Sequence, residues 1–372
     1  IDQFRIGGTE RQLKLLAEGL DRQRFEPSLF LLRGEIEHPM KPAGVPSTVL
    51  GLHSIGNMEG MRRIWYFSRK LRQQGCHIVQ TFFQDSALCG TAGGRLAGVS
   101  PILISVRDLL YWADTRSIRQ LRYAIKLAHG VISNSYAVKG KLAPLVGKKW
   151  IHVIPNGIET GEAFAKNSAA KRSLTAVFGV NEQIPIIVMI SNCNRPVKRV
   201  DLLIESAPLV LKERDAFFFI IGEGRLRAGL ERYARDLGVD HRVVFAGSRN
   251  DVDSILAGSD VFVNTSDSEG LSNSVMEAMR AGLPVVASDV DGNRELISHG
   301  RNGFLFDAGD AGQLAAQLVK LLKDPSLGQD VGERARTFIE DDMSVQKMID
   351  RYENYYEAMI IQKDFAQKRL DS

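Results

Sequence analysis

The stretch VFVNTSDSEGLSNSVMEA, residues 261–278, carries the clearest structural pattern in the chain. Its first four residues are mostly apolar and lead into small polar residues and a glycine, which is typical of a strand followed by a loop. Apolar residues then return at helical spacing from Val275. We therefore expect a strand, a loop and a helix that starts near Ser272, where free backbone N–H groups and the helix dipole suit a phosphate.

Two glutamates flank this helix start. Glu269 stands in the loop before Gly270, where its carboxylate can accept hydrogen bonds from hydroxyl groups. Glu277 is placed one to two turns into the helix, where a carboxylate can hold both hydroxyls of a ribose. On spacing alone, an ordinary helix start with two exposed glutamates explains the pattern equally well.

Short apolar runs alternate with helix-period segments in both directions from this stretch, as in βαβ units around a mostly parallel sheet. A turn-forming Pro155-Asn156-Gly157 cluster separates two such series. The strands expected before it are residues 28–33, 48–52, 77–82, 101–106, 130–134 and 151–154. Those expected after it are residues 184–190, 216–221, 243–245, 261–264 and 284–287.

Two series of this kind predict an α/β fold with two Rossmann-like, doubly wound domains facing each other across a cleft. Ligand crevices of such domains lie at the carboxyl ends of the strands. We expect an N-terminal domain over residues 1–158, with its first strand a stub ending before Gly7, and a C-terminal domain over residues 159–343. The aromatic and charged segment 344–372 is expected to pack on the first domain, because it is too long to cap its own strand.

Composition argues against several other classes of protein. The 372 residues, 44% hydrophobic and 25% charged, suffice for two domains of normal size. The 48 basic residues are scattered among 44 acidic ones, and this argues against a nucleic-acid partner. Neither the cysteines, Cys76, Cys89 and Cys193, nor the histidines show metal-ligand spacing. No apolar run approaches the roughly 18 to 20 residues that span a bilayer, so any membrane contact is expected to be peripheral.

Further motifs occur in order along nearly the whole chain. They are Gly7-Gly8-Thr9-Glu10-Arg11, Ile154-Pro155-Asn156-Gly157-Ile158, Ile221-Gly222-Glu223-Gly224, the Glu-Ala-Met-x-Ala-Gly-Leu-Pro-Val-Val-Ala-Ser-Asp of residues 277–289, and Gly292-Asn293-Arg294-Glu295-Leu296. Together with the Glu-Gly-Leu-Ser of residues 269–272, they closely resemble the retaining nucleotide-sugar glycosyltransferases of the GT-B fold. This is the large family four, also described as glycosyl transferases group 1.

The resemblance implies transfer of a sugar from a nucleoside diphosphate-sugar, most often a UDP-sugar, to a hydroxyl of a glycan or lipid-linked acceptor. It further implies retention of the anomeric configuration, a role in polysaccharide biosynthesis, and a cytoplasmic location that includes the inner face of the membrane. No metal or other cofactor is expected. The alternatives are a sugar-nucleotide epimerase or hydrolase of the same architecture, and a non-catalytic subunit that binds nucleotide-sugar.

The resemblance also assigns residues around the donor diphosphate. Gly7 and Gly8 would approach it from the first domain, although a tight turn without ligand explains them as well. Cations at Lys198 and Arg195 can offset charge on the departing diphosphate, which would make a bound metal unnecessary. Relatives commonly carry Arg or Asn where Cys193 stands, so Lys198 is the safer assignment.

The remaining donor contacts are expected in the second domain. By resemblance, the Gly222–Gly224 turn lies near the nucleotide base, and it lacks the third glycine of a dinucleotide-binding loop because Arg227 stands there. A Rossmann dehydrogenase is therefore disfavoured. Backbone groups at Gly247 and Ser248 are expected to contact the base. Those expected to contact the diphosphate or the sugar are Gly270, Leu271, Ser272 and Asn273.

Two further features of the first domain carry charge. Arg107-Asp108 ends a strand where many relatives place His-Asp. Arg107 could contact the acceptor, and Asp108 could orient the acceptor or accept a proton from it. A structural ion pair between Arg107 and Asp108 is equally open. Basic residues also line one helix face, which could rest on anionic lipid, meet a lipid diphosphate or simply be solvated: Arg116, Arg119, Arg122 and Lys126.

Another helix of the first domain is expected from residues that recur along one face at spacings of three and four: Met58, Met61, Ile64, Trp65, Ser68 and Leu71.

Overall fold

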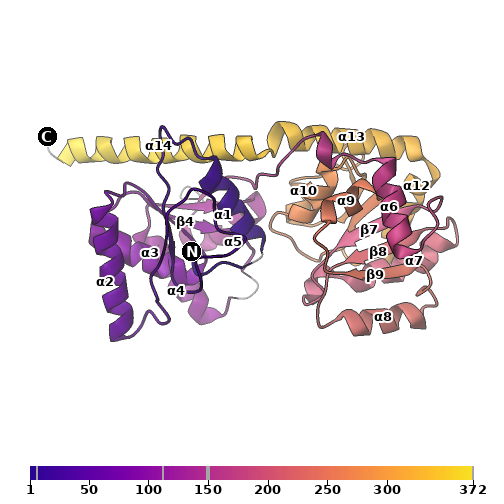
Figure 1. Cartoon of the computed structure of the whole chain (residues 1–372), viewed down its shortest axis with the longest axis horizontal. Coiled ribbons are helices and arrows are strands. Elements are labelled where there is room, and N and C mark those ends of the chain that lie inside the picture. Colours follow the sequence, from indigo (N-terminus) through magenta and orange to yellow (C-terminus); the bar gives the residue numbers. More distant parts are fainter. Residues whose placement is uncertain (6, 111–112, 148–150, 371–372) are drawn as a thin grey trace. The chain divides into compact units, whose positions relative to one another are not determined.

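The structure is a computed structural model that describes residues 1–5, 7–110, 113–147 and 151–370. The chain divides into two compact units (Figure 1). Unit 1 comprises Ile1–Gly157 together with Val345–Ser372, and unit 2 comprises Ile158–Ser344. The domain limits expected from the sequence, 158/159 and 343/344, stand next to these junctions.

Unit 1 is built on parallel strands. A two-stranded sheet pairs β1 (Leu29–Leu31) with β2 (Ser47–Val49). A four-stranded sheet has the order β3-β4-β5-β6, formed by Val79–Phe82, Ile102–Val106, Gly130–Ser133 and Ile151–Val153. The helices between them are α1 (Gly8–Gly19), α2 (Met58–Gln73), α3 (Gln84–Ala97), α4 (Thr115–Leu127) and α5 (Tyr136–Val146). Each strand overlaps a range that the sequence predicts, and all but β2, which begins one residue before the expected 48–52, fall inside it.

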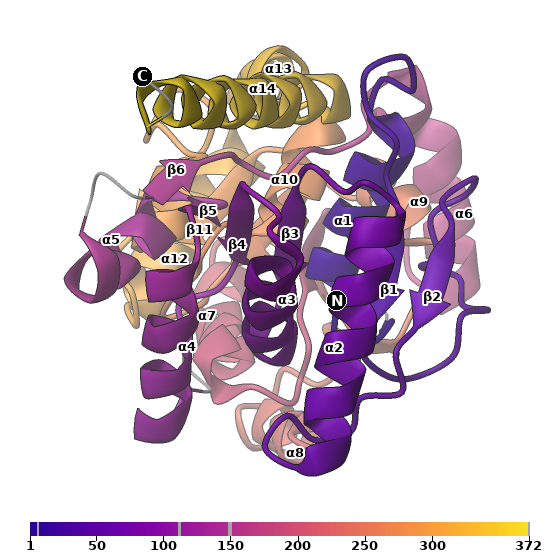
Figure 2. The same cartoon turned by 90° about the vertical axis from the view of Figure 1, so that its left-hand side faces the viewer.

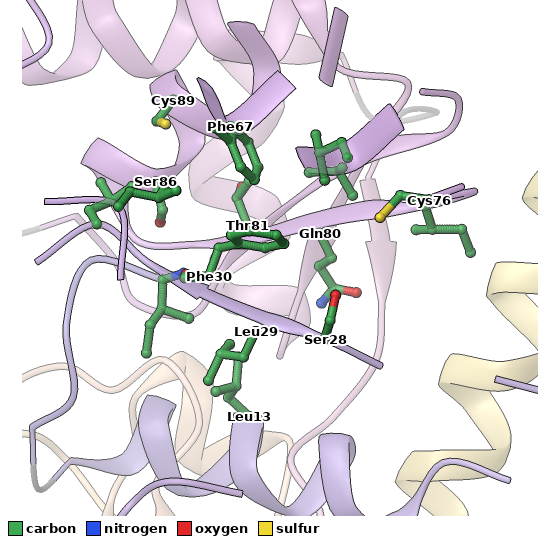
Figure 3. A pocket seen from close by; sticks show the side chains of 17 residues that line it. Leu13, Ser28, Leu29, Phe30, Phe67, Cys76, Gln80, Thr81, Ser86 and Cys89 are labelled. Carbon is green, nitrogen blue, oxygen red and sulfur yellow. The ribbon is translucent and has the colours of Figure 1, made fainter. Parts of the chain in front are cut away.

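The two sheets of unit 1 are separated between β1 and β3. A cavity of about 100 Å³ lies there, lined by Leu29 and Phe30 on one side and by Gln80 and Thr81 on the other (Figure 3). The stub expected before Gly7 forms no strand among the described residues. Its residues still take part in pairing, because the Leu32 N–H donates to the Ile1 carbonyl at 2.9 Å.

Helices α2, α3 and α4 form one layer over the four-stranded sheet, with α3 between the other two (Figure 2). Helix α3 lies close to its neighbours because its glycines have no side chains. A Cβ on Gly90 would come within 2.3 Å of Thr81 Cγ2, and one on Gly93 within 2.4 Å of the Phe67 ring. These small residues set α3 deep in the layer, between α2 and α4.

Unit 2 is a six-stranded parallel sheet with the order β12-β11-β10-β7-β8-β9. Its strands are Ile186–Ile190 (β7), Phe217–Ile221 (β8), Val243–Gly247 (β9), Val261–Asn264 (β10), Val285–Ser288 (β11) and Phe304–Phe306 (β12). The chain runs outward from β7 to β9 and then returns to the other side of β7 with β10. The direction therefore reverses between β7 and β10, which is where doubly wound sheets open a crevice at their carboxyl edge.

The helices of unit 2 cover both faces of this sheet. They are α6 (Ser168–Phe178), α7 (Val200–Leu211), α8 (Arg227–Asp236), α9 (Val252–Ala257), α10 (Asn273–Arg280), α11 (Asp291–Arg294), α12 (Ala311–Lys323) and α13 (Pro325–Asp342). Two apolar clusters, one on each side of the sheet, surround fully buried strand residues such as Phe218 and Phe219. Burial on both faces explains why the strands appear as continuous apolar runs in the sequence.

The last helix, α14 (Val345–Leu370), belongs to unit 1 although it follows unit 2 in the sequence. Its buried face includes Tyr352 and Met348, and Glu353 pairs with Arg24 at 2.7 Å. A Cβ on Gly157 would come within 2.9 Å of the Met348 Cβ. The expected turn at residues 155–157 therefore ends directly beneath this helix.

We predict opposite effects for two alanine substitutions in α13. A Cβ on Gly332 would come within 2.0 Å of the Gly282 carbonyl oxygen, whereas one on Gly328 meets nothing closer than 3.6 Å. Gly332→Ala should lower the free energy of unfolding by about 1–3 kcal/mol, because backbone must move. Gly328→Ala should be neutral or stabilising by up to about 1 kcal/mol, since alanine favours helix. Urea denaturation followed by circular dichroism measures both, and equal midpoints would contradict the packing.

Candidate functional site

Two loops meet where the unit 2 sheet reverses direction. One follows β7 and includes the short 3₁₀ helix Pro196–Lys198, and the other follows β10. The Asp267 N–H donates to the Val197 carbonyl at 2.8 Å. The Thr265 hydroxyl lies 2.9 Å and 2.7 Å from the carbonyl oxygens of the two residues that follow Val197. These bonds hold the loops together at the carboxyl edge of the sheet.

Lys198 and Glu269 form an ion pair across these loops. The lysine Nζ lies 2.6 Å from Glu269 Oε1, and the two side chains are 24% and 10% exposed. The same oxygen accepts hydrogen bonds from the Ser266 hydroxyl at 2.7 Å and the Asn264 amide at 3.2 Å. Three donors on one oxygen fix the carboxylate, so both charges are oriented before any ligand arrives.

Helix α10 begins directly behind this carboxylate. Ser272 caps it by accepting from the Val275 N–H at 3.4 Å, which places the helix start where the sequence predicts it. Glu277 is the fifth residue of the helix and is half-buried. The loop with Gly270 packs closely on α11, since a Cβ on Gly292 would come within 2.5 Å of the Glu269 carbonyl oxygen. The motif residues therefore form one packed unit of strand, loop and helix.

Buried polar groups that the sequence analysis did not select support the loop. The Asn293 amide donates to Asn264 Oδ1 at 3.3 Å and to the Ser288 carbonyl at 3.0 Å. The Asn293 Oδ1 and the Ser191 hydroxyl are buried without a hydrogen-bond partner in the described part of the chain. Signals for these residues exist in the sequence: Asn264 ends a strand, and Asn293 belongs to the motif that begins at Gly292.

The basic segment after β7 contains two arginines in different environments. Arg195 is exposed, and no hydrogen bond or ion pair of its side chain is recorded within the described ranges. Arg199, which the sequence analysis did not select, adopts a φ of +46° and lies 3.3 Å from Asp267 and 3.0 Å from Asp201. A positive φ is costly for a non-glycine residue, so this conformation is held by its contacts. Of the two residues expected to offset phosphate charge, the structure brings only Lys198 to Glu269.

The glycines of the Gly222–Gly224 turn are required by close contact with neighbouring backbone. A Cβ on Gly222 would come within 2.0 Å of the Ser191 carbonyl oxygen, and one on Gly224 within 2.3 Å of the Cys193 carbonyl carbon. The turn therefore packs on the loop after β7. Arg227, which stands at the third glycine position of a dinucleotide-binding loop, pairs with Glu223 and donates to the Phe245 carbonyl at 3.2 Å.

The residues expected at the base lie beside this turn. Gly247, at the end of β9 with a φ of +72°, accepts a hydrogen bond from the Gly222 N–H at 2.8 Å. Ser248 follows it and is exposed. The turn after β8 and the end of β9 are thus joined at the carboxyl edge of the sheet.

In unit 1, the Gly7-Gly8 pair opens helix α1. A Cβ on Gly7 would come within 2.7 Å of Glu10 Oε2, so the buried Glu10 carboxyl lies at this helix start. Burial raises the pKa of Glu10. An acidic group at the N-terminus satisfies the helix dipole and competes with a phosphate there. The glycine pair therefore shares its helix start with a carboxyl group, and its contact with the diphosphate stays a prediction.

Arg107 is engaged within unit 1. Its guanidinium donates to the Tyr352 hydroxyl at 3.1 Å and to the Asn156 side chain. These bonds join the end of β4 to α14 and to the end of the unit. Asp108 accepts from the Leu110 N–H at 2.9 Å and lines a cavity of about 290 Å³ with Thr9. Arg107 is thus tied to the fold, and Asp108 lies on a cavity wall.

A third cavity of unit 1, of about 550 Å³, opens between α4 and the loop that precedes α2. Its cationic walls carry Arg116 and Arg119 from α4, with Arg33 opposite. Arg33 pairs with Asp85 at 2.8 Å, whereas no ion pair is recorded for the two α4 arginines in the part of the chain that the structure describes. We call this cavity the α4 groove; it can accommodate an anion.

Among the residues that the structure describes, no group of three or more His, Cys, Asp or Glu side chains could hold a metal ion. None of the described helices combines the length and the apolar character needed to cross a membrane.

Comparisons with known proteins cover both units. Residues 184–324 match the family described as glycosyl transferases group 1, and residues 6–162 match glycosyltransferase family 4. The N-acetyl-alpha-D-glucosaminyl L-malate synthase of Bacillus anthracis is 30% identical over 275 residues, which are 73% of this chain and 71% of that protein. The UDP-Gal:alpha-D-GlcNAc-diphosphoundecaprenol alpha-1,3-galactosyltransferase of Escherichia coli is 25% identical, over 96% of this chain and 95% of the relative.

Solved structures agree on the fold. Anabaena HepE in complex with UDP-glucose superimposes with a TM-score of 0.81 at 22% identity, covering 96% of this chain and 98% of that one. Because each half matches the family and a 30% identical relative covers 73% of the sequence, the chain belongs to the family 4 glycosyltransferases of the GT-B fold, transferases of polysaccharide and glycoconjugate biosynthesis.

Proposed function

We propose that this glycosyltransferase moves a sugar from a UDP-sugar to a hydroxyl of an anionic glycan or lipid-linked acceptor, with retention of the anomeric configuration. The observation that carries the proposal is the Lys198–Glu269 ion pair at the carboxyl edge of the unit 2 sheet. Unit 2 would bind the donor and unit 1 the acceptor.

In this proposal Lys198 and Glu269 exchange partners when the donor binds. The diphosphate would take the lysine ammonium, since two phosphates offer it more negative charge than one carboxylate. Glu269 would then accept hydrogen bonds from sugar hydroxyls while Ser266 and Asn264 keep it in place. Charge developing on the leaving diphosphate is thereby stabilised by a positioned cation, and no covalent nucleophile is needed.

We propose UDP as the nucleotide of the donor. Anabaena HepE, which shares the fold, is described in complex with UDP-glucose, and the galactosyltransferase of Escherichia coli is named for UDP-Gal. A relative from Corynebacterium glutamicum is instead named as GDP-mannose-dependent. The base contacts proposed at Gly247 and Ser248, and the ribose contact proposed at Glu277, would account for either nucleotide. The choice between them is therefore experimental.

For the acceptor, the cations of unit 1 favour a negatively charged molecule. The acceptors named for relatives include L-malate, a diphosphoundecaprenol-linked sugar and poly(ribitol-phosphate), all of them anionic. The α4 groove offers Arg116 and Arg119 to such a group, and Asp85 at its floor also lines the cavity that holds Asp108. A lipid-linked acceptor would bring the reaction to the cytoplasmic surface of a membrane. The relatives named here are described as transferases or, for the Bacillus anthracis protein, as a synthase, and none is described as an epimerase, a hydrolase or a binding subunit.

Removing either partner of the ion pair should abolish transfer but leave the fold intact. We expect Lys198→Met and Glu269→Gln each to lower kcat by about 10²–10³-fold, because each group acts where charge develops in the transition state. The matched control is the Lys323–Glu213 pair, which has the same 2.6 Å distance in unit 2 but lies on the exposed surface. Lys323→Met and Glu213→Gln should retain wild-type turnover. Full activity in Glu269→Gln would remove this residue from the mechanism.

The donor can be identified by thermal shift with UDP-, GDP- and ADP-sugars. A ligand that binds only the folded state at 100 times its Kd adds about 2.7 kcal/mol to stability, so the true donor should raise Tm most. Product analysis by NMR with the identified α-linked donor should give an α-linked product, and chelation with EDTA should leave the rate unchanged. An inverted product, or loss of activity on chelation that Mg²⁺ restores, would contradict the proposed mechanism.

The α4 groove makes a separate prediction about the acceptor. Arg116→Ser and Arg119→Ser should each raise the KM for an anionic acceptor by about 10-fold, the usual loss for one charge-assisted hydrogen bond. The KM for the donor should not change. Arg122→Ser, on the same helix but outside the groove, serves as the control. An unchanged acceptor KM in all three variants would place the acceptor elsewhere.

A further inference from the structure

Helix α2 has two apolar faces, and only one of them is buried. Ile64, Phe67 and Leu71 pack into a core cluster with residues of β3 and α3. On the outward side, Met58, Met61 and Trp65 recur at spacings of three and four and are 66%, 57% and 56% exposed. The six residues that the sequence places on one helix face therefore divide, with Ile64, Ser68 and Leu71 inward and the other three in solvent. Three large apolar side chains in one exposed row mark an interaction surface.

Cations surround this row. Helix α2 carries five of the 48 basic residues of the chain, Arg62, Arg63, Arg69, Lys70 and Arg72, but only one of the 44 acidic residues, Glu59. Its net charge of +4 equals that of the whole chain, because the remaining 43 basic and 43 acidic residues cancel. Helix α4, which has four basic residues and no acidic one, is equally positive, so the cationic character extends over both helices.

The cations and aromatic rings are arranged together. The Arg69 guanidinium lies 5.0 Å from the centroid of the Trp65 ring, and the Lys70 Nζ lies 5.6 Å from that of Tyr66. Arg63 pairs with Glu59 at 3.5 Å, but no ion pair is recorded for Arg62, Arg69 or Lys70 among the described residues. These charges are available to an external partner of opposite sign.

The surroundings of α2 extend the same character. Helix α4 lies in the same layer (Figure 2), with the deeply set α3 between them, and its outward side carries the exposed Tyr123 among basic residues. The loop that leads into α2 forms one wall of the α4 groove through Ser54 and Gly56. A flat partner lying on α2 would therefore reach the groove that we assign to the acceptor.

We propose that the outward face of α2 docks on an anionic lipid bilayer. Met58, Met61 and Trp65 would enter the boundary between headgroups and acyl chains, Tyr66 would lie at headgroup level, and the cations would contact lipid phosphates. The exposed methionines favour lipid over a nucleic acid, which would match the arginines but not the apolar row. The docking surface rests on α2 alone, and only its link to a lipid-linked acceptor rests on the proposed function.

Vesicle co-sedimentation of the full chain tests the docking directly, without donor or acceptor. Wild-type protein should sediment with vesicles of phosphatidylcholine containing one quarter phosphatidylglycerol, and not with phosphatidylcholine alone. Raising the salt to about 1 M should weaken binding, because the Debye length falls to about 3 Å. The absence of binding to anionic vesicles at low salt would overturn the proposal.

Two sets of variants separate the apolar and the ionic contributions. Met61→Ser with Trp65→Ser should lower the vesicle partition coefficient by at least about 10-fold. Arg62→Gln with Arg69→Gln and Lys70→Gln should lower it by about fivefold for each cation removed. The matched control is Tyr136→Ser with Lys139→Gln on α5, an exposed aromatic ring with a lysine 5.8 Å from its centroid.

Wild-type partitioning of the apolar variant would show that the apolar row does not enter the bilayer, and this too would overturn the proposal. Tighter binding of the wild type to duplex DNA than to anionic vesicles would assign the surface to a nucleic acid instead. Because the altered side chains are exposed, or half-buried in the case of Lys70 and Lys139, melting temperatures should match the wild type. Transfer to an acceptor free in solution should also be unchanged, so a failure of docking and a failure of the proposed function give different results.

Discussion

The ion pair between Lys198 and Glu269 depends on the order of strands in unit 2. Only where β7 and β10 lie side by side do two loops from distant parts of the sequence share one edge of the sheet. Backbone and hydroxyl contacts from Thr265 and Asp267 then fix the lysine loop on the glutamate loop. Three donors on one oxygen hold the Glu269 carboxylate in a single orientation, and the conformational entropy of this ordering is lost when the sheet folds. The site is therefore organised before a ligand binds.

Much of this architecture follows from local pattern. Strands buried on both faces appear as apolar runs, and apart from the stub before Gly7 every strand predicted for the two series is present in the structure. The helix start at Ser272 could be predicted because capping is a property of a few adjacent residues. The family could be identified from motif order, and the comparisons confirm it.

The roles of single residues were harder to predict, because they depend on partners that are distant in the sequence. For Arg107 the sequence left an acceptor contact and a structural role equally open, and the structure adds bonds from its guanidinium to Tyr352 and Asn156. The glycines of the turn after β8 fit against backbone, and Arg199, which the sequence analysis did not select, pairs with Asp267 of the loop that carries Glu269. The exposure of the apolar row on α2 could not be predicted either, since its residue spacing is the same as that of a buried helix face. Whether such a face is covered is decided by tertiary packing, which periodicity does not describe.

The split of unit 1 across the sequence has a consequence for biosynthesis. Strands β3 to β6 emerge from the ribosome first, but α14, which buries Tyr352 against them, is made only after all of unit 2. Unit 2 is continuous in sequence and can complete its apolar core during synthesis, whereas unit 1 keeps an uncovered surface until α14 has been made. The nascent N-terminal half therefore exposes apolar side chains longest, and it is the part that depends most on chaperone protection.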